Sequence, residues 1–423
     1  MNILVVGSGG REHAICHLFS KSKRASKIYC APGNGGIAAV AECVPIKADD
    51  IEALCEFATL KSIELTFVGG ETSLALGIVD EFQRRGRRII GPSKAAAKLE
   101  ASKAFAKDFM SVHGIPTAKY VTAHSPGFAI LELESGDFGD ASKPVVVKAD
   151  GLAAGKGVVI AKNRAEAITA INEMATLVGT AAADKIVLEE CLTGREISLL
   201  MFCDSEHFAL MPATRDHKRI GEGDTGPNTG GMGTITEGSL VSPDQTNEII
   251  EKIIKPTLRG CAKEDIPFRG VLFIGLMLTA DGPKVLEYNV RFGDPETQSI
   301  LVRLETDVVD ICDAILNGSL DTLEIKWRTG SSATIVLAAE GYPAKPRTGD
   351  VIHGLDEATG VNGVNVFHAG TSRSADGEFY TAGGRVLGIT AVADTLEDAL
   401  TRAYSAVDKI SWPGMQYRRD IGK

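Results

Sequence analysis

The chain has 423 residues, 44% of them hydrophobic, with a net charge of −10 at pH 7, as expected for a globular protein of roughly two to four domains. Its negative charge argues against nucleic acid and anionic membranes as partners, because a net anion is attracted to neither. The eight cysteines form no C-x-x-C pair and predict free thiols rather than a zinc site or a disulfide framework. No apolar run approaches the ~20 residues of a membrane span, and the start lacks the pattern of a signal peptide, so a cytoplasmic location is expected.

Residues 1–102 are expected to form an α/β domain around a doubly wound parallel sheet. Short apolar runs typical of buried strands alternate there with a helical pattern, and such strands usually pair in parallel. The helix is GREHAICHLFSKS, at 10–22. The strands are NILVVG at 2–7, KIYCAP at 27–32, ELTFVGG at 64–70 and RRIIGP at 87–92.

Residues 103–325 predict an α+β unit with a mainly antiparallel sheet. A long helical run at 94–114 leads into this unit and is closed by Ile115-Pro116. A second helix is expected at 246–262. Strands are expected at 143–150, 155–161, 184–192, 196–203, 270–282 and 283–291.

Residues 326–423 predict a small β-rich domain. The dipeptide Asp376-Gly377 is typical of a hairpin turn, and the run 395–410 is typical of a closing helix. Strands are expected at 333–341, 364–370, 378–384 and 385–392.

A glycine-rich loop with a lysine, KADGLAAGKGVVIA, occupies residues 148–161. It is not a Walker A loop, because Gly151 and Gly155 are separated by three residues and Lys156 is followed by Gly157 instead of Ser or Thr. The residues after it form a strand, so the loop is expected to cap a hairpin whose backbone N–H groups could line an anion site, with Lys148 adding a point charge. A plain glycine-rich turn with a solvated lysine is the alternative.

Polar residues alternate along the run KVLEYNVRFGDPET at 284–297. Because strand side chains alternate between two faces, Glu287, Asn289 and Arg291 are expected on one face. Two oxygen ligands beside a guanidinium suit a Mg²⁺–polyphosphate complex, whereas the alternative is the solvent-facing side of an amphipathic strand. The other face is expected to carry Leu286, Tyr288 and Val290.

A third run, VLEECLTGREISL at 187–199, is a strand that continues into Glu189–Leu192. Backbone N–H and C=O groups at such a position can bind the edge of an adenine, and Glu196 could accept from ribose hydroxyls. Clustered acids of this kind are more often simply solvated.

Six motifs occur in the order found in ATP-grasp ligases: SKAFAKDF, KADGLAAGKGV, EECLTGREIS, DHKR, GPNTGGMG and LEYNVRFGDPE. From VVGSGGREHA to RRDIG, essentially the whole chain resembles the phosphoribosylamine–glycine ligase (glycinamide ribonucleotide synthetase) family. The resemblance implies a central ATP-grasp domain with a hairpin-flap subdomain at about 120–190. It also implies ATP-dependent joining of glycine to 5-phosphoribosylamine through glycyl phosphate, which gives glycinamide ribonucleotide, ADP and phosphate in purine biosynthesis.

The resemblance also implies roles for particular residues. Glu287 and Asn289 match the ligands of Mg²⁺ or Mn²⁺, and Arg291 and Asp216 are expected to be catalytic. ATP is expected to contact Lys103, Lys148, Gly151, Gly155, Lys156, Gly157, Glu189, Glu190, Cys191, Leu192, Glu196, Arg219 and Asn228. The phosphoribosylamine side is expected to use Gly9, Gly10, Arg11, Glu12, Glu71, His217, Lys218, Asp294, Pro295 and Glu296, although a hydrogen-bonded structural role is the alternative for His217.

The chain departs from the family pattern at three places. The sequence GGETSL at 69–74 lacks both prolines of the family's G-P-E-x-P-L, which predicts a looser loop. Arg215 stands where an uncharged residue is expected and could alter the electrostatics of the substrate side. Residues 234–238 read Thr-Ile-Thr-Glu-Gly in place of an aromatic-Ser-Pro run.

Other functions are weighed against this one. A carboxylating ATP-grasp ligase of purine metabolism is the nearest alternative, and a catalytically silent ATP-binding relative is a second. A nicotinamide-dependent oxidoreductase is disfavoured, because a G-x-G-x-x-G motif from Gly7 would need glycine where Glu12 stands. The expected partners are small molecules, namely glycine, 5-phosphoribosylamine and ATP, and the expected state is a monomer or weak homodimer.

Overall fold

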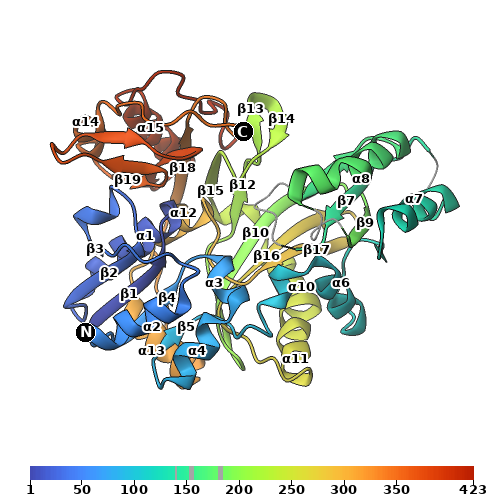
Figure 1. Ribbon diagram of the computed structural model, residues 1–423, viewed down its shortest axis with the longest axis horizontal. Coiled ribbons are helices and arrows are strands. Elements are labelled where there is room, and N and C mark those ends of the chain that lie inside the picture. Colours follow the sequence, from blue (N-terminus) through green and yellow to red (C-terminus); the bar gives the residue numbers. More distant parts are fainter. Residues whose placement is uncertain (139–140, 152–156, 180–183) are drawn as a thin grey trace.

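The first hundred residues form a five-stranded parallel sheet with the strand order β3–β2–β1–β4–β5 (Figure 1). The order reverses at β1, and the inner strands are runs of buried apolar residues, as in a sheet covered by helices on both faces. The predicted doubly wound parallel sheet is confirmed. Its elements are β1 (Asn2–Gly7), α1 (Gly10–Ser20), β2 (Lys27–Pro32), η1 (Ile37–Ala39), β3 (Glu42–Cys43), α2 (Ile51–Leu60), β4 (Leu65–Val68), α3 (Glu71–Leu76), α4 (Ile78–Arg84) and β5 (Ile89–Ile90).

The predicted single helix over 94–114 is wrong, because the chain is extended at Ser102 between α5 (Lys98–Ala101) and α6 (Lys103–Val112). The Ser102 hydroxyl accepts the amide of Phe105 at 3.1 Å and caps α6, and it also donates to Asp150 at 2.9 Å. The break therefore places Lys103 at the first position of α6, next to the glycine-rich loop.

The part of the chain between about 120 and 190 is a four-stranded antiparallel sheet, in the order β6–β9–β7–β8, with two helices packed on it. The computed structural model describes residues 1–138, 141–151, 157–179 and 184–423. Lys148 pairs with Val158 across β7 and β8, which confirms that the glycine-rich loop joins a hairpin. Gly155 and Lys156 lie outside the described residues. The elements are β6 (Tyr120–Ala123), α7 (Pro126–Ser135), β7 (Val145–Ala149), β8 (Val158–Ala161), α8 (Arg164–Val178) and β9 (Ile186–Glu190).

The remaining chain is organised around one antiparallel nine-stranded sheet, in the order β17–β16–β10–β12–β15–β18–β22–β19 with β11 beside β10. The pair β15–β18 joins the strands of the central part to those of the C-terminal part, on either side of the predicted limit at 325/326. The strands are β10 (Arg195–Asp204), β11 (Phe208–Leu210), β12 (Thr214–Asp216), β15 (Gly233–Thr236), β16 (Arg269–Thr279), β17 (Gly282–Asn289), β18 (Ser331–Ala338), β19 (Val364–His368) and β22 (Arg385–Ala393).

Helices and two small hairpins surround this sheet. The predicted helix at 246–262 is present as three consecutive helical segments, α10 (Pro243–Ile249), η4 (Ile250–Ile254) and α11 (Lys255–Lys263). Among the described residues, no helix has the length and apolar character needed to cross a bilayer. The other elements are β13 (Arg219–Gly221), η2 (Glu222–Asp224), β14 (Thr225–Asn228), η3 (Gly238–Leu240), α12 (Glu296–Leu301), α13 (Val308–Asn317), η5 (Leu320–Thr322), α14 (Leu355–Thr359), β20 (Thr371–Arg373), β21 (Phe379–Thr381) and α15 (Leu396–Val407).

The C-terminal core gives a test of the large sheet. Leu337 on β18 is fully buried, so Leu337→Ala should lower the free energy of unfolding by about 3 kcal/mol through lost burial and the cavity left behind. Leu60 is 78% exposed, and Leu60→Ala should change it by less than about 0.5 kcal/mol. Urea unfolding followed by circular dichroism measures both, and equal midpoints for the two variants would contradict the assignment of Leu337 to the core.

Candidate active site

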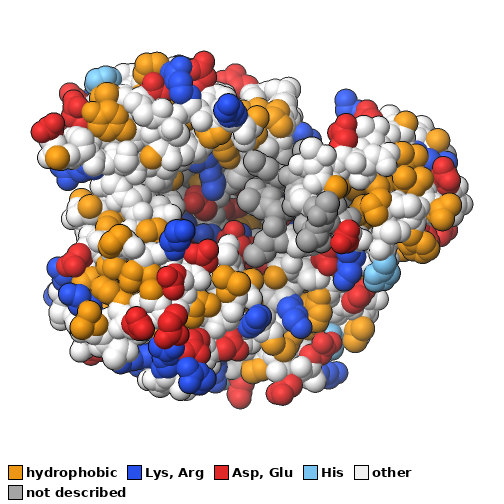
Figure 2. Space-filling view, in the orientation of Figure 1, with side chains coloured by type: hydrophobic (Ala, Val, Ile, Leu, Met, Phe, Trp, Pro, Cys, Tyr) orange, Lys and Arg blue, Asp and Glu red, His pale blue; other side chains and the backbone are white. Residues whose placement is uncertain are grey.

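A cleft of about 420 Å³ opens where the parallel sheet, the four-stranded sheet and the large sheet meet. Figure 2 shows the hollow, with acidic and basic side chains inside it. The volume is in the range of small-molecule sites. The charged side chains that line the cleft are Arg11, Lys103, Lys107, Lys148, Lys218, Arg291, Arg385, Glu71, Glu100, Glu189, Asp216, Glu287, Asp294 and Glu296.

Strand β17 supplies the predicted metal ligands, but its alternation is broken by a bulge. Glu287 pairs with Gly275 and Val285 pairs with Leu276, so Leu286 has no partner of its own on β16. The prediction that Leu286 shares a face with Tyr288 and Val290 is therefore wrong, since Leu286 is only partly buried next to Glu287, whereas Tyr288 and Val290 are buried. The predicted polar face is confirmed, because Glu287, Asn289 and Arg291 all line the cleft.

Glu287 is held charged by cations from three separate parts of the chain. Burial would raise the pKa of its carboxyl group, but Lys218, Lys148 and Lys103 outweigh burial and lower the pKa. The Lys218 ammonium lies 3.9 Å from the Glu287 carboxylate. A charged carboxylate and a neighbouring amide oxygen are hard ligands that fit Mg²⁺.

The rest of a metal shell has to come from elsewhere. Within the described ranges, no group of three or more His, Cys, Asp or Glu side chains is placed to hold a metal ion. The pair Glu287 and Asn289 thus matches the way magnesium binds beside phosphates, through one or two protein groups, substrate oxygens and water.

Glu189, at the end of β9, is buried between two lysines. Its carboxylate lies 2.8 Å from Lys107 Nζ and 2.7 Å from Lys148 Nζ. Lys148 also donates to the carbonyl of the bulged residue Leu286, at 3.1 Å. Burial lowers the pKa of Lys107 to about 8, against the attraction of Glu189. The Glu189 side chain is therefore committed to orienting Lys148, and its backbone lies in register with Tyr120 of β6 and Val146 of β7.

The other predicted nucleotide residues near β9 divide into two groups. Lys103 donates to the carbonyl of Gly151 at 3.0 Å and lines the cleft together with Gly151 and Gly157; burial lowers its pKa. The remaining residues lie outside the cleft lining. These are Glu190, which accepts the amide of Lys119, and Cys191, Leu192 and Glu196.

The hairpin of β13 and β14 forms a further wall. At its base Lys218 contacts the carboxylate of Glu196, and this attraction, with that of Glu287, outweighs burial and raises the pKa of Lys218. Asn228, predicted to contact ATP, lines the cleft. Arg219 does not, because its guanidinium donates to the carbonyl of Gly226 within the hairpin, at 2.7 Å.

Arg291 connects the metal strand to the first domain. Its guanidinium binds Glu71 at 3.1 Å and Glu100 at 2.7 Å, and it donates to the Asn289 amide oxygen at 3.1 Å. Arg291, with Arg11, lowers the pKa of Glu71 against burial, whereas burial raises that of Glu100. The guanidinium thus fixes the orientation of the Asn289 side chain.

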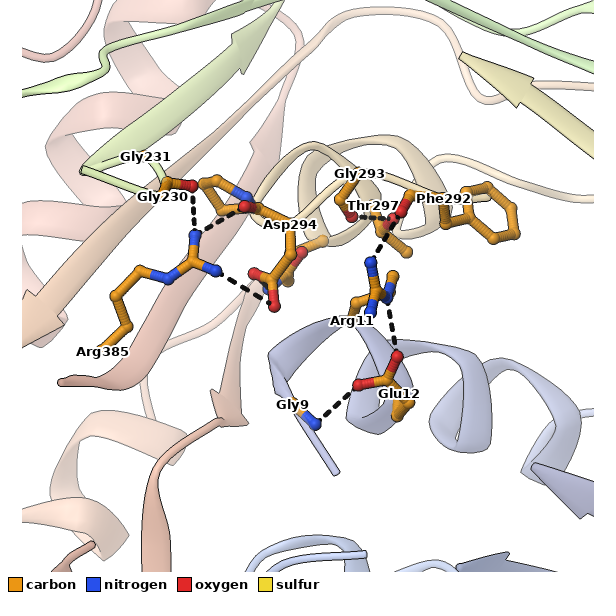
Figure 3. A network of polar contacts seen from close by, with 12 residues as sticks. Gly9, Arg11, Glu12, Gly230, Gly231, Phe292, Gly293, Asp294, Thr297 and Arg385 are labelled. Carbon is orange, nitrogen blue, oxygen red and sulfur yellow. Dashed lines mark hydrogen bonds and ion pairs between the residues drawn. The ribbon is translucent and has the colours of Figure 1, made fainter. Parts of the chain in front are cut away.

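Two arginines from opposite domains hold the turn after β17, as Figure 3 shows. Arg11 of α1 donates to the carbonyl of Phe292 at 2.9 Å. Arg385 of β22 donates to the carbonyl of Asp294 at 2.5 Å, lies 3.6 Å from its carboxylate and also contacts the carbonyl of Gly230. Burial alone would raise the pKa of the Asp294 carboxyl group, but the positive charges of Arg385 and Arg11 outweigh burial and lower it.

Asp216 and Glu296 form a pair of like charges in the cleft wall. Burial raises the pKa of both carboxyl groups, and their mutual repulsion adds to the shift of Asp216. One Asp216 oxygen accepts the amide of His217 at 2.7 Å. Because its pKa is raised, a carboxylate pair of this kind can bind a proton and hold it. A group that accepts a proton during a reaction needs this property.

A second cavity of about 380 Å³ adjoins the cleft and shares Asp294 and Arg385 with it. Gly9 lines it at the start of α1. Glu12 lies behind, where its carboxylate accepts the Gly9 amide at 2.6 Å. The predicted residues Gly10 and Pro295 line neither cavity. The other lining residues of the second cavity are Ser8, Gly33, Asn34, Ala369, Gly370, Thr371 and Ala382.

The departures from the family pattern have local explanations. The expectation of a looser loop is wrong, because residues 71–76 form α3, in which Ser73 donates to the carbonyl of Ala48 at 2.6 Å. Arg215 does not line the cleft, since on β12 it faces away from Asp216 and donates to the backbone of Lys423 at 2.7 Å. The expectation that it alters the substrate side is not supported by this position.

His217 lies outside the cleft lining. Its Nδ1 lies 3.1 Å from the carbonyl of Gly233, and its Nε2 accepts the amide of Gly422 at 3.1 Å. Both ring nitrogens are therefore used by the backbone, as the structural alternative requires. Burial lowers the pKa of His217 to about 4.

Three charged lining residues were not predicted from the sequence: Glu100, Lys107 and Arg385. Glu100 lies in the helical run outside any motif, and Lys107 lies in SKAFAKDF, from which only Lys103 was predicted to contact ATP. Arg385 was visible only as a charge at the start of an otherwise apolar strand, in the sequence GGRVLG.

The chain matches three family models. These describe the N domain of phosphoribosylglycinamide synthetase over residues 1–100, its ATP-grasp (A) domain over 101–297 and its C domain over 332–423. A phosphoribosylamine–glycine ligase of Vibrio parahaemolyticus is 47% identical, with 100% of this chain and 98% of the relative covered.

Solved structures are similar to this chain over nearly its whole length. The crystal structure of phosphoribosylamine–glycine ligase from Thermotoga maritima matches with a TM-score of 0.85 and 35% identity over 100% of both chains. The biotin carboxylase domain of 2-oxoglutarate carboxylase from Hydrogenobacter thermophilus, in complex with MgADP and bicarbonate, has a TM-score of 0.71 over 98% of this chain and 91% of its own, at 18% identity. The second match concerns the fold alone.

The histidine gives a pH prediction. The pKa of His217 falls from 6.5 to about 4 on folding, so below pH 6.5 the unfolded chain binds a proton that the folded chain does not. The free energy of unfolding should therefore fall as the pH drops from 6.5 towards 4. Between pH 7 and pH 4.5, this free energy should fall by about 2.5 kcal/mol less in His217→Gln than in the native chain. Urea unfolding at both pH values measures this. The exposed His124 is the control, and a loss for His217→Gln as large as that for His124→Gln would contradict the role of burial.

Proposed function

The chain belongs to the phosphoribosylglycinamide synthetase family, and we propose that its cleft joins glycine to 5-phosphoribosylamine with the hydrolysis energy of ATP. The supporting observation is one continuous site. A carboxylate–amide pair, Glu287 and Asn289, faces lysines from separate elements, and the cleft continues past Asp294 into a second cavity. The products are glycinamide ribonucleotide, ADP and phosphate, a step of purine biosynthesis.

The first step forms glycyl phosphate. A carboxylate oxygen of glycine attacks the γ-phosphorus, the new O–P bond forms as the bond to ADP breaks, and ADP leaves. Lys103, Lys148 and Lys218 offset the charge on the phosphates. A divalent ion on Glu287 and Asn289, Mg²⁺ or Mn²⁺, would neutralise further charge on the transferring group.

The second step forms the amide. The amine of 5-phosphoribosylamine attacks the acyl carbon, the C–N bond forms, and the C–O bond breaks as phosphate leaves. We assign Asp216, whose pKa burial raises, to accept the proton that the amine loses. Arg291 lies beside the metal pair, where it can bind the phosphate that forms.

The two substrates are assigned to the two cavities. ATP occupies the cleft, with its adenine against the backbone of residues 189–192, its ribose towards Glu196 and its phosphates beside Gly151 and Gly157. The phosphoribosyl group lies in the second cavity, where the N-terminus of α1 and the guanidinium of Arg385 suit a phosphate. Arg11, Glu71 and Asp294 lie between the two.

The remaining assignments belong to the same proposal. The domains are taken as residues 1–102, 103–325 and 326–423. The enzyme is expected to act in the cytoplasm as a monomer or weak homodimer, on small molecules rather than on nucleic acid or membranes.

Phosphate release tests the function. ATP, glycine and phosphoribosylamine together should release phosphate, and omission of any one should abolish the release. Bicarbonate in place of glycine distinguishes the carboxylating alternative. Release that depends on bicarbonate and not on glycine would overturn the proposal.

The metal assignment predicts the behaviour of Glu287→Ala. Loss of the charged ligand should lower kcat at least about 100-fold at limiting Mg²⁺, while the thermal unfolding midpoint stays within a few degrees. Glu251→Ala, on the exposed side of η4, is the matched control and should retain activity. Native activity of Glu287→Ala at limiting Mg²⁺ would remove Glu287 from the metal site.

The phosphate assignment predicts the behaviour of Lys148→Met. Without its ammonium, Glu189 keeps only Lys107 as a partner, and ATP loses a point charge. KM for ATP should rise and kcat should fall, each by roughly tenfold or more. Lys252→Met, at an exposed pair with Glu248, is the control. Steady-state kinetics with varied ATP measures both, and unchanged constants for Lys148→Met would place the phosphates elsewhere.

A further inference from the structure

The last residues of the chain lie against a hairpin that reaches the cleft. Strands β13 and β14, joined by η2, pair only with each other in the part of the chain that the structure describes. An isolated two-stranded hairpin is marginally stable in water. The position of this hairpin therefore depends on contacts with neighbouring side chains, and residues 416–423 supply several of them.

Arg418 is at the centre of these contacts, with only 2% of its side chain exposed. It donates to the carbonyl of Arg219, at the start of β13, at 3.1 Å and to Asp224, in the turn, at 2.7 Å. Its other nitrogens bind both carboxylate oxygens of Asp420, each at 2.8 Å. Asp420 in turn accepts the amide of Gly223, at 2.8 Å.

Residues 416–423, the tail, are themselves bound to the C-terminal domain. Tyr404 of α15 donates to the carbonyl of Arg418 at 2.9 Å, and its hydroxyl accepts the amide of Ile421 at 3.2 Å. The amide of Arg419 donates to Glu222 at 3.1 Å, on the hairpin. The tail thus contacts α15 on one side and the hairpin on the other, and so holds the hairpin in a fixed position relative to α15.

The base of the hairpin belongs to the cleft. Thr229 donates to the Lys218 carbonyl through both its amide, at 2.7 Å, and its hydroxyl, at 2.8 Å. Lys218 and Asn228 line the cleft, and the Lys218 ammonium lies 3.9 Å from Glu287. A displaced hairpin would therefore move two groups that face the proposed phosphates.

We propose that Arg418 is a positioning residue for nucleotide binding, which fixes the hairpin so that Lys218 and Asn228 face the triphosphate. This inference rests on the proposed function, because it takes ATP as the ligand of the cleft. A merely structural arginine would stabilise the fold without any specific effect on ATP. The two roles differ in whether ATP affinity changes in the folded enzyme.

The test compares Arg418→Met and Arg418→Lys with Arg419→Met. Arg419 is the matched control, because its exposed guanidinium stacks on Tyr417 and not on the hairpin. Arg418→Met should raise KM for ATP, and the Kd of a non-hydrolysable ATP analogue measured by calorimetry, by roughly tenfold. Its kcat should stay within about threefold. Arg418→Lys should give an intermediate value, since it keeps the charge but not the fork, and Arg419→Met should match the native enzyme.

A lower thermal midpoint for Arg418→Met with native ATP constants would overturn the proposal. If Arg418→Met does not fold, Asp420→Ala decides, because it removes the carboxylate that holds Arg418 and Gly223. That variant should raise the Kd for the ATP analogue by about fivefold, and an unchanged Kd would overturn the proposal. If the native enzyme binds the analogue but does not ligate glycine, the proposed function is refuted. The positioning role of Arg418 is still tested in that case, because the calorimetric Kd does not depend on ligation.

Discussion

Burial of charge is the constraint on which the site depends. A charged group removed from water is stable only when it is paired, and the cleft has ionised groups of both signs along its walls. Glu189 lies between Lys107 and Lys148, and Arg291 joins Glu71 and Glu100. These pairs hold the cationic groups in place before any ligand binds, so binding needs little rearrangement of the protein.

The same pairs connect parts of the chain that are distant in sequence. Arg291 lies after β17, whereas Glu71 begins α3 and Glu100 belongs to α5. Arg11 and Arg385 grip the turn at 292–294 from the first and last domains. Removal of one partner would leave the other buried and unpaired, which costs several kcal/mol. The interfaces between the domains and the geometry of the site are therefore stabilised by the same contacts.

Much of the fold could be predicted from local patterns. The parallel sheet followed from short apolar runs between helices, and the hairpin followed from the strand after Gly157. The errors have physical causes. The bulge at Leu286 breaks the period of two, and Ser102 caps a helix inside a run that is helical by composition. Periodicity contains no information about either event, since both depend on a contact with another strand or loop.

The site shows the same division. Motifs located Glu287, Asn289, Lys103 and Lys148, because those residues lie in long characteristic runs. Glu100, Lys107 and Arg385 come from a helical run and a late strand, and only folding brings them to the cleft. His217 belongs to a motif, yet its ring is bound by the backbone on both sides, which no spacing in the sequence could predict.

The pairing of β15 with β18 has a mechanical consequence. Because hydrogen bonds of one sheet run from the strand of the metal ligands to the last strands of the chain, the central and C-terminal parts cannot swing apart without breaking that ladder. The sheet of β6, β7, β8 and β9 is separate from it and is joined through residues 113–119 and 191–194. Any movement of this smaller sheet relative to the large one would therefore bend the chain at those two short connections, while the paired strands of the large sheet keep their places.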